Sequence, residues 1–377
     1  MATKKRVLVS TWAFPPSPAG SAVILYELLR HMVQDEMVAV HTIGDPPLLD
    51  GPSLGIERHM VLLPGSYIWT LRCMRRAPWL FIPLIRREIV RQCKRHSIER
   101  IYAHFPNHCF LVAAWQASEY LGLPLTVYFD ILWEEGTMGM HYAAECESRI
   151  VNRADSVFAI TEFAVKHLEQ KHGKRVNLVP HVIDTSGLPS CLQALSNESR
   201  PVILYSGAIY PNMNQDSLER LAQASTIART RPIVDLCTWS LPDELRRLGM
   251  RSRCLSRARV MAAQAESSIL FMPLAFESKY PVMIRNNCAI KLMDYLCSGR
   301  PILVHAPADC YVTYIARREG FALVVDRPSV TELAAAIDLL VRDRLLQERL
   351  VAGALTFVRT RDSRVWAQRL WAALSNN

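Results

Sequence analysis

The chain alternates short runs of apolar, often β-branched residues with stretches of helical periodicity, and this alternation limits the fold more than any other feature. In the first half, strand-like runs occupy 6–12, 37–43, 101–105, 125–129, 156–160 and 176–179, and helical patterns occupy 23–33, 67–96, 108–121, 141–153 and 162–172. Strands that alternate with helices at these lengths form parallel βαβ units. The sequence therefore predicts an α/β fold with a doubly wound parallel sheet.

A polar stretch with proline and serine at 180–200 interrupts the alternation, which then starts again. Strand-like runs follow at 202–206, 233–238, 268–273, 302–305 and 322–325, and helical patterns at 214–230 and 329–341, the latter opened by the capping-box pair Ser329 and Glu332. A chain of 377 residues also has the length of two ordinary domains. We therefore expect one domain over 1–185, a second over 198–355, and a C-terminal helix over 356–377 that packs back on the first.

The composition is that of a protein with a substantial core, because 50% of the residues are hydrophobic and 21% are charged. The first residues do not resemble a secretory signal, and no apolar run is long enough to cross a membrane. The ten cysteines are scattered, without a C-x-x-C pair or a His/Cys cluster at zinc-like spacing. We expect a cytoplasmic protein with reduced cysteines and no structural zinc.

The net charge of +9 is concentrated in two places. Nine basic residues and two acidic ones lie between Arg72 and Arg100, and six arginines lie between Arg246 and Arg259 without an acid. The first cluster falls within the segment 67–100, where aromatic residues such as Trp69 and Trp79 are interleaved with the arginines. That mixture is typical of a surface that binds an anionic membrane, which would place the protein at the inner face of a membrane. The alternative is a core helix with a solvated arginine face; no recognition motif favours nucleic acid.

Two loops follow predicted strands at the sheet edge where α/β proteins bind ligands. The first loop, 13–21, has three prolines and ends in Gly20 and Ser21, where the next helix begins. A glycine there lets a ligand approach the backbone closely. The loop contains neither G-x-G-x-x-G nor a P-loop motif, and an ordinary proline-rich turn remains the alternative.

The second loop lies within 270–301, where a strand, a long polar loop, a short helix and a further strand are expected. Lys291 and Asp294 lie three residues apart on one face of that helix. The residues expected to form an anion site around its first turn are Arg285, Asn286, Asn287, Ala289, Ile290 and Lys291. The Asp294 carboxylate can accept two hydrogen bonds from a ribose diol.

The segment K-L-M-D-Y-L-C-S-G-R-P-I-L-V at 291–304 resembles the donor-binding signature of family 4 retaining glycosyltransferases. Stretches that resemble other parts of this family, in the family's order, are 14–21, 102–106, 124–130, 154–161 and 202–209. The resemblance implies the GT-B fold, in which two Rossmann-like domains face each other across a cleft. It assigns 1–185 to the acceptor and 198–355 to a nucleotide-sugar. Gly207, and Gly20 and Ser21 of the first-strand loop, are expected to bind the donor.

The resemblance also implies roles for individual residues. The family signature has two glutamates eight residues apart, of which the first contacts the donor sugar and the second binds the ribose. Asp294 takes the place of the second glutamate, and Asn286 takes the place of the first. Glu277 is the alternative contact to the donor sugar. The family often has an Arg and a Lys after the first strand of the second domain. This chain has neither there, so Lys279, Arg285 or Lys291 would neutralise the diphosphate.

The candidate catalytic residues are Glu277 and, on the acceptor-side strands that the resemblance identifies, His104 and Asp130. His104 would contact the donor sugar or the acceptor. For His104 the alternative is a structural histidine with satisfied hydrogen bonds, and for Asp130 it is helix capping. The expected function is transfer of a sugar from a nucleotide-sugar donor to an acceptor hydroxyl with retention, without a metal or other cofactor. The acceptor would be a sugar, a lipid-linked glycan or a small molecule. A catalytically silent GT-B-like subunit and a nucleotide-sugar epimerase are the alternatives.

Overall fold

The computed structural model describes residues 6–17, 19–42, 53–61, 73–74, 76–133, 141–192 and 200–375. The chain forms two compact units. The first consists of 1–182 and 363–377, and the second of 183–362. The chain therefore returns to the first unit after residue 362, later than the expected residue 356. Residues 356–359 continue the helix α15 (Arg344–Arg359) of the second unit, and only α16 (Ser363–Ser375) belongs to the first.

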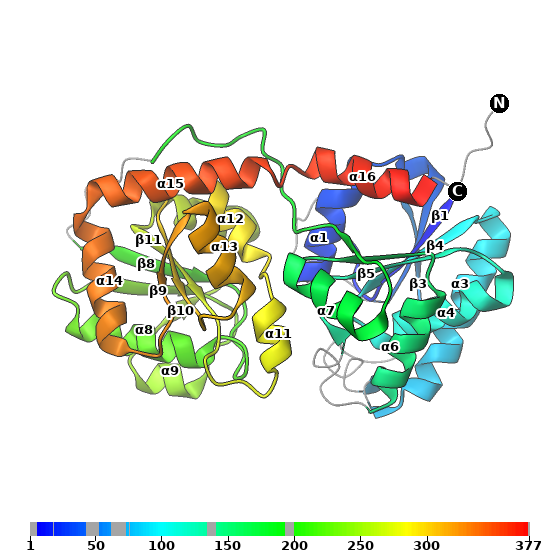
Figure 1. Cartoon of the computed structure of the whole chain (residues 1–377), viewed down its shortest axis with the longest axis horizontal. Coiled ribbons are helices and arrows are strands. Elements are labelled where there is room, and N and C mark those ends of the chain that lie inside the picture. The colour runs from blue at the N-terminus through cyan, green and yellow to red at the C-terminus, as the bar shows by residue number, and fades with distance from the viewer. Residues whose placement is uncertain are drawn as a thin grey trace. The chain divides into compact units, whose positions relative to one another are not determined.

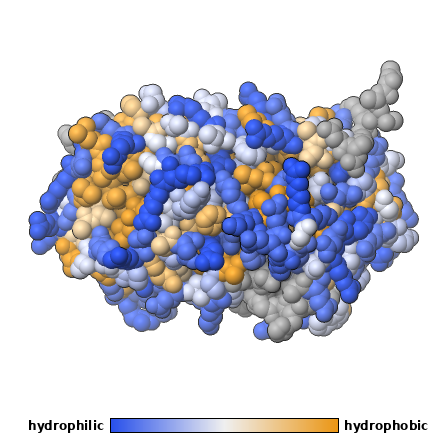
Figure 2. All heavy atoms as spheres, in the orientation of Figure 1, coloured by the Kyte–Doolittle hydropathy of each residue, from blue (hydrophilic) through white to orange (hydrophobic). Residues whose placement is uncertain are grey.

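The first unit has a parallel sheet in the order β3-β2-β1-β4-β5-β6-β7. The strands are β1 (Val7–Ser10), β2 (Met37–His41), β3 (Glu57–Met60), β4 (Arg100–Phe105), β5 (Leu125–Phe129), β6 (Ser156–Ala159) and β7 (Asn177–Leu178). The helices are α1 (Gly20–Leu29), α3 (Pro78–His96), α4 (His108–Leu121), α6 (His141–Arg153), α7 (Glu162–His172) and α16, with a short 3-10 turn at Gln34–Glu36. Figure 1 shows α16 beside α1, where His31 Nε2 and Ser363 Oγ are 3.0 Å apart. Hydrophilic residues cover most of the visible surface over α6 (Figure 2).

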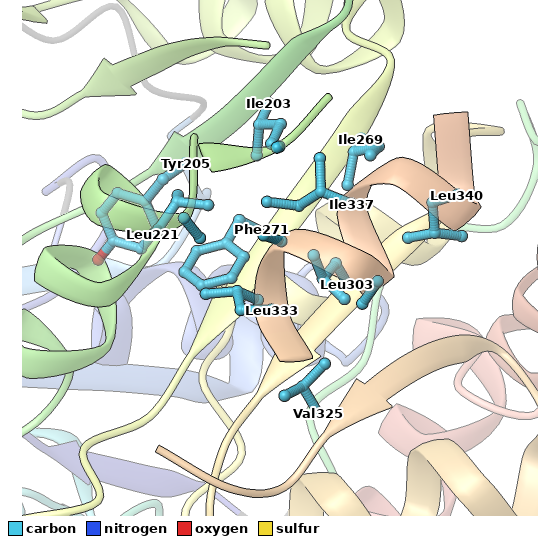
Figure 3. Close-up of a cluster of buried hydrophobic side chains, with 14 of the residues drawn as sticks. Ile203, Tyr205, Leu221, Ile269, Phe271, Leu303, Val325, Leu333, Ile337 and Leu340 are labelled. Atoms are coloured by element: carbon cyan, nitrogen blue, oxygen red, sulfur yellow. The ribbon is translucent and has the colours of Figure 1, made fainter. Parts of the chain in front are cut away.

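The second unit has a parallel sheet in the order β10-β9-β8-β11-β12-β13. Its strands are β8 (Val202–Ser206), β9 (Ile233–Cys237), β10 (Ser252–Arg253), β11 (Ile269–Pro273), β12 (Ile302–His305) and β13 (Ala322–Val325). Its helices are α8 (Gln215–Ile227), α9 (Asp243–Arg247), α10 (Arg257–Glu266), α11 (Pro281–Asn286), α12 (Lys291–Cys297), α13 (Tyr311–Glu319), α14 (Val330–Arg342) and α15. In Figure 3 the side chains of β8, β11 and β12 meet those of α8 and α14 in a buried cluster, which is the core of this unit.

Both sheets are doubly wound, which confirms the predicted fold class. In each sheet the strand order reverses beside the first strand of the unit, between β1 and β4 and between β8 and β11. The loops after these strands therefore diverge to opposite faces of the sheet, and ligands of such folds bind where they separate. The two candidate loops of the sequence follow β1 and β11, so each lies at one of these positions.

Local capping explains why several helices begin where the sequence predicts. The Asn107 side chain accepts hydrogen bonds from Cys109 N and Phe110 N, at 3.0 and 3.4 Å, and opens α4. Thr161 Oγ1 accepts one from Ala164 N at 3.0 Å and opens α7. Ser329 Oγ accepts one from Glu332 N at 3.2 Å, so the predicted capping box at α14 has its first bond.

The structure also contains elements that the sequence pattern did not predict. These are β3, α9, β10, α10, α11, α13 and α15. Glu57, Arg58 and Met60 of the edge strand β3 are exposed, so β3 lacks the apolar signal of a buried strand. The prediction of a polar loop before residue 286 is partly wrong, because the helix α11 occupies Pro281–Asn286. Among the described residues, no helix is long and apolar enough to cross a membrane.

Candidate functional site

Lys291, the first residue of α12, lies against the carboxyl end of β8. Its Nζ donates a hydrogen bond to the hydroxyl of Tyr205 at 2.6 Å and lies 4.0 Å from the centre of the Tyr205 ring. Tyr205 is fully buried. Figure 3 shows its ring within the hydrophobic cluster and its hydroxyl pointing away from that cluster. Burial lowers the pKa of Lys291 to about 7, because a low-dielectric environment disfavours the ammonium form.

Gly207 leaves the space that the Lys291 amine occupies. It follows β8 directly and has φ of +124°, a conformation that residues with a side chain rarely adopt. A Cβ at this position would lie 2.9 Å from Lys291 Nζ. The sequence predicted both residues as donor-binding. They are 84 positions apart in the chain, and the structure brings them together, so that open backbone lies beside a cation.

The Tyr205 hydroxyl also organises the loop after β8. It donates to Ala208 O at 2.6 Å and accepts from Asn214 Nδ2 at 2.8 Å. The Asn214 side chain in turn accepts a hydrogen bond from Tyr210 N at 2.9 Å. The loop in which the family's Arg and Lys are missing is thus held by neutral groups, and Lys291 lies against it from α12.

Asp294 lies one turn after Lys291 and is paired with an arginine that sequence reasoning did not connect to it. Arg257 Nη2 lies 3.0 Å from Asp294 Oδ1, and the two side chains are 47% and 13% exposed. Burial raises the pKa of Asp294, and the Arg257 guanidinium opposes that shift. Next to it, the Tyr295 hydroxyl accepts a hydrogen bond from Ser206 N at 3.0 Å, which fixes α12 on the end of β8.

The remaining donor-side predictions lie in different surroundings. Asn286 is the buried last residue of α11, and its Nδ2 donates to Val282 O at 2.7 Å, so it lies in a helix and not in the expected polar loop. Asn287, Ala289 and Ile290 form the turn between α11 and α12 and are partly exposed. Arg285 pairs with Asp309 through Nη2 at 2.6 Å, with both side chains 59% exposed.

Glu277 lies in the loop after β11, and its side chain is 88% exposed. The carboxylate that shapes this loop is that of Asp216, on the first turn of α8. Asp216 Oδ2 accepts hydrogen bonds from Phe276 N at 2.9 Å and from Glu277 N at 3.3 Å, and from Arg220 at 2.8 Å. Glu277 is therefore presented to solvent by a loop that is itself fixed. Lys279, in the same loop, is also exposed.

In the first unit, the structure brings His104 and Asp130 into contact. His104 lies on β4 and Asp130 follows β5, and His104 Nε2 lies 3.2 Å from Asp130 Oδ2. Their side chains are 0% and 7% exposed, and His104 Nδ1 lies 3.4 Å from the Tyr102 hydroxyl. Burial raises the pKa of Asp130, although the neighbouring His104 acts in the opposite direction. The second carboxylate oxygen, Oδ1, is buried without a hydrogen-bond partner among the described residues.

Gly20 and Ser21 are the first two residues of α1. Gly20 is exposed, whereas Ser21 is 5% exposed and its Oγ has no hydrogen-bond partner among the described residues. The loop before them is partly described, since Pro18 lies outside the described residues. Their predicted role in donor binding therefore stays a prediction.

Sequence reasoning missed the side chains that hold Lys291 and Asp294 in place, namely Tyr205, Tyr295, Asn214 and Arg257. Only Arg257 had a signal, as a member of the arginine cluster 246–259 whose local charge lacked a partner in sequence. The tyrosines look like ordinary core residues, because a hydroxyl at a strand end has no sequence pattern of its own.

Comparison with known proteins agrees with this architecture. Residues 18–186 match the model of Glycosyltransferase Family 4, and no curated protein matches the sequence significantly. Sucrose-phosphate synthase from Thermosynechococcus elongatus has a TM-score of 0.73 at 13% identity over 98% of each chain. Anabaena HepE, solved in complex with UDP-glucose, has a TM-score of 0.70 at 15% identity, over 99% of this chain and 100% of its own. WaaG, a glycosyltransferase involved in lipopolysaccharide biosynthesis, has a TM-score of 0.66 at 14% identity, over 98% of this chain and 100% of its own. These likenesses confirm the GT-B fold.

Proposed function

We propose that this protein transfers a sugar from a nucleoside diphosphate sugar to an acceptor hydroxyl with retention of configuration. The premise is that the chain has the GT-B fold and that its residues 18–186 match the model of glycosyltransferase family 4. The observation that supports this best is the pair formed by Lys291 and Gly207. A cationic side chain lies against backbone that a glycine leaves open, at the carboxyl end of β8 where the strand order reverses. Such a position suits a diphosphate.

The proposed donor occupies the second unit. Its diphosphate lies beside Lys291, and its ribose hydroxyls donate to the carboxylate of Asp294 one turn further along α12. Arg257, which holds that carboxylate in the free protein, is close enough to contribute a second positive charge. Glu277, whose side chain is 88% exposed and lies 3.9 Å from Arg220 Nη2, is the proposed contact to the sugar. Buried Asn286 is less suited to that contact, because its amide already donates to its own helix.

The chemistry follows from where charge develops. As the bond from the sugar to the diphosphate breaks, the sugar becomes oxocarbenium-like and the leaving diphosphate gains negative charge. A cation beside the leaving group stabilises that charge, and the leaving phosphate oxygen takes the proton of the acceptor hydroxyl. The acceptor lies on the first unit, where His104 and Asp130 are the proposed positioning groups.

The donor proposal is tested by calorimetric titration with UDP-glucose, which HepE binds in the solved complex, and then with a panel of GDP- and ADP-sugars. Lys291→Met is expected to weaken binding at least tenfold, the loss of a charge-assisted contact. The control is Lys166→Met, which removes an exposed lysine of α7 in the first unit. Equal losses in both variants, or no binding of any nucleotide-sugar by the wild type, would contradict the proposal.

Product analysis separates the alternatives. Hydrolysis or transfer of the sugar in the presence of candidate acceptors, with the anomer identified by NMR, tests turnover and retention. Tight nucleotide binding without turnover would favour a catalytically silent subunit, which the replacement of the first signature glutamate by Asn286 motivates. Conversion of the donor sugar to another sugar in the absence of any acceptor would favour an epimerase.

We further propose that the acceptor is reached at an anionic membrane surface, through one stripe of α3. Exposed residues recur along this helix at Leu80, Leu84, Arg87, Arg91 and Arg95, at intervals of three or four. The stripe is apolar at its beginning, where Trp79 is also 67% exposed, and basic at its end. Tyr67, Trp69, Arg72 and Arg75 of the predicted segment 67–100 lie outside the described residues.

The structure also shows which arginines make a clean test of membrane binding. Arg86 is partly buried and lies 5.1 Å from the centre of the Tyr120 ring, so reversing its charge would disturb packing. The double variant Arg87→Glu/Arg95→Glu is expected to abolish sedimentation with liposomes of phosphatidylcholine and phosphatidylserine at low salt. Arg246→Glu, on exposed α9 in the second unit, is the control. Failure of the wild type to sediment would contradict the proposal.

A further inference from the structure

Three potential metal ligands from two elements of the first unit meet away from the candidate site. Glu57 and His59 lie on the edge strand β3, two residues apart and therefore on the same face of the strand. His96 is the last residue of α3. One ligand atom from each side chain lies within 4.8 Å of the other two. No other group of three such side chains occurs within the described part of the chain.

The distances match those of ligands around a single small cation. Glu57 Oε1 lies 2.9 Å from His59 Nε2 and 3.4 Å from His96 Nε2. Nitrogen and oxygen ligands at about 2.0–2.1 Å from a tetrahedral zinc ion lie about 3.3 Å from one another. The two separations from Glu57 are thus near that value, and all three ligand atoms lie within 4.8 Å of one another, so small side-chain adjustments let them converge on one ion.

The contacts also differ from ordinary ion pairs between histidine and a carboxylate. His104 with Asp130 and His172 with Glu147 both form directed hydrogen bonds, at 3.2 and 2.7 Å. The Nε2 atoms of His59 and His96 are buried, and neither forms a hydrogen bond with any described residue, in spite of the short contacts to Glu57. Ring nitrogens that lie near an oxygen but do not point at it are what convergence on a common cation produces, and buried polar atoms without a partner are costly.

The surroundings favour a cation and allow it to enter. The His59 and His96 side chains are only 16% and 14% exposed, whereas Glu57 is 48% exposed and opens the group to solvent. The carbonyl oxygen of His96 at the end of α3 already accepts a hydrogen bond from Arg6 Nη1 at 3.0 Å, so the negative charge that attracts the cation is that of Glu57. Gln92, one turn earlier on the same face, has a buried Oε1 without a hydrogen-bond partner among the described residues, which could accept a hydrogen bond from a water bound to the cation.

We propose that Glu57, His59 and His96 bind one divalent transition-metal ion of the zinc class. Two imidazoles and one carboxylate are ligands that zinc prefers, and a water completes four-coordination. The ion connects β3, the edge strand of the sheet, to the end of α3. It has no part in the proposed sugar transfer, and its role is to hold an exposed edge strand that has few apolar residues of its own.

Zinc binding to the full chain tests this directly. The protein carries Cys191→Ser and Cys254→Ser, because these two exposed thiols would bind zinc themselves. After treatment with EDTA and removal of the chelator, zinc is titrated in competition with a chromogenic zinc indicator. We expect one tight equivalent, weakened at least tenfold in both His59→Gln and His96→Gln. His167→Gln, on α7 outside this group, is the control and should bind like the parent.

A second measurement excludes misfolding as the cause of any loss. In EDTA the variants should melt at the temperature of the parent, and added zinc should raise the melting temperature of the parent and of His167→Gln only. The cobalt-substituted parent should give a spectrum of nitrogen and oxygen ligands without a thiolate band. The proposal is overturned if the parent binds no tight equivalent, or if both histidine variants bind zinc as the parent does.

Discussion

The Lys291 ammonium lies 2.6 Å from the hydroxyl oxygen of Tyr205, two residues before the glycine that gives it room. Tyr205 belongs to the hydrophobic core of the second unit, so the contact places a titratable cation at the boundary between core and open loop. The same burial that positions the amine also lowers its pKa to about 7. The charge at the proposed diphosphate site therefore depends on pH in the neutral range.

Donor binding should take up a proton. Above pH 7 the free protein holds a mostly neutral Lys291, and a bound diphosphate favours the ammonium form and raises its pKa. Affinity for a nucleotide-sugar should then fall about fiftyfold from pH 7 to pH 9, as the protonated fraction of a group with pKa about 7 does. Calorimetry at pH 8.5 in two buffers of different ionisation enthalpy measures the proton directly. In Lys291→Met the pH dependence should disappear; a flat wild-type profile would show that Lys291 does not bind the phosphates.

Asp294→Ala should weaken nucleotide binding by about 1.5–3 kcal/mol, the usual range for lost charge-assisted hydrogen bonds. Arg257→Ala and the double variant show whether this loss of affinity comes from lost hydrogen bonds to the ribose or from the release of Arg257. If Asp294 binds ribose, the variant costs affinity even when Arg257 is already absent. If its only role is to hold Arg257, the double variant binds like either single one. Asp326→Ala, which removes a carboxylate paired with Arg317 outside the proposed site, is the control.

Asp130→Asn should separate function from stability. Burial raises the pKa of Asp130 in the folded protein above its unfolded value. The unfolded chain therefore releases this proton at lower pH, so stability falls as pH rises through that window and the cost is fully present above it. The amide removes that cost while keeping an acceptor for His104, and the melting temperature at pH 7 should be equal or higher. Transfer should slow up to about a hundredfold through lost positioning. Unchanged kcat/KM would make the pair purely structural.

Gly353→Ala should destabilise the protein, against the usual preference of helices for alanine. Gly353 lies within α15, and a Cβ there would come within 2.5 Å of Gly320 O and 2.9 Å of Gly320 C. Backbone atoms cannot rotate away, so the helix or the turn must shift, at a cost of about 1–3 kcal/mol. Gly187→Ala, where a Cβ would meet nothing within 4 Å, is the matched control for urea unfolding. A stabilised Gly353→Ala would mean that α15 moves freely.

The sequence predicted most strands of both sheets and several helices, although not α15, because their signals are local. Apolar periodicity and caps act within a few residues, and the bounds of α4, α6, α7, β5, β8 and β12 agree with their predicted ranges. The short helix α11 and the exposed strand β3 lack such periodicity. Asn286, expected in a loop, is therefore found at the end of a helix, and the ligand-like pair Glu57 and His59 passed unnoticed.

By itself, the sequence determined that the chain has two doubly wound α/β units and that Lys291 and Asp294 share one face of a short helix, since i and i+3 neighbours follow from helix geometry alone. The tertiary structure decided the partners. Lys291 meets Tyr205 86 residues away, and Arg257 meets Asp294 37 residues away. Glu57 and His59 meet His96 only because β3 and the end of α3 come together. Contacts of this kind depend on which strands are neighbours in the sheet and on which helix ends pack against them. No local sequence pattern determines the order of the strands.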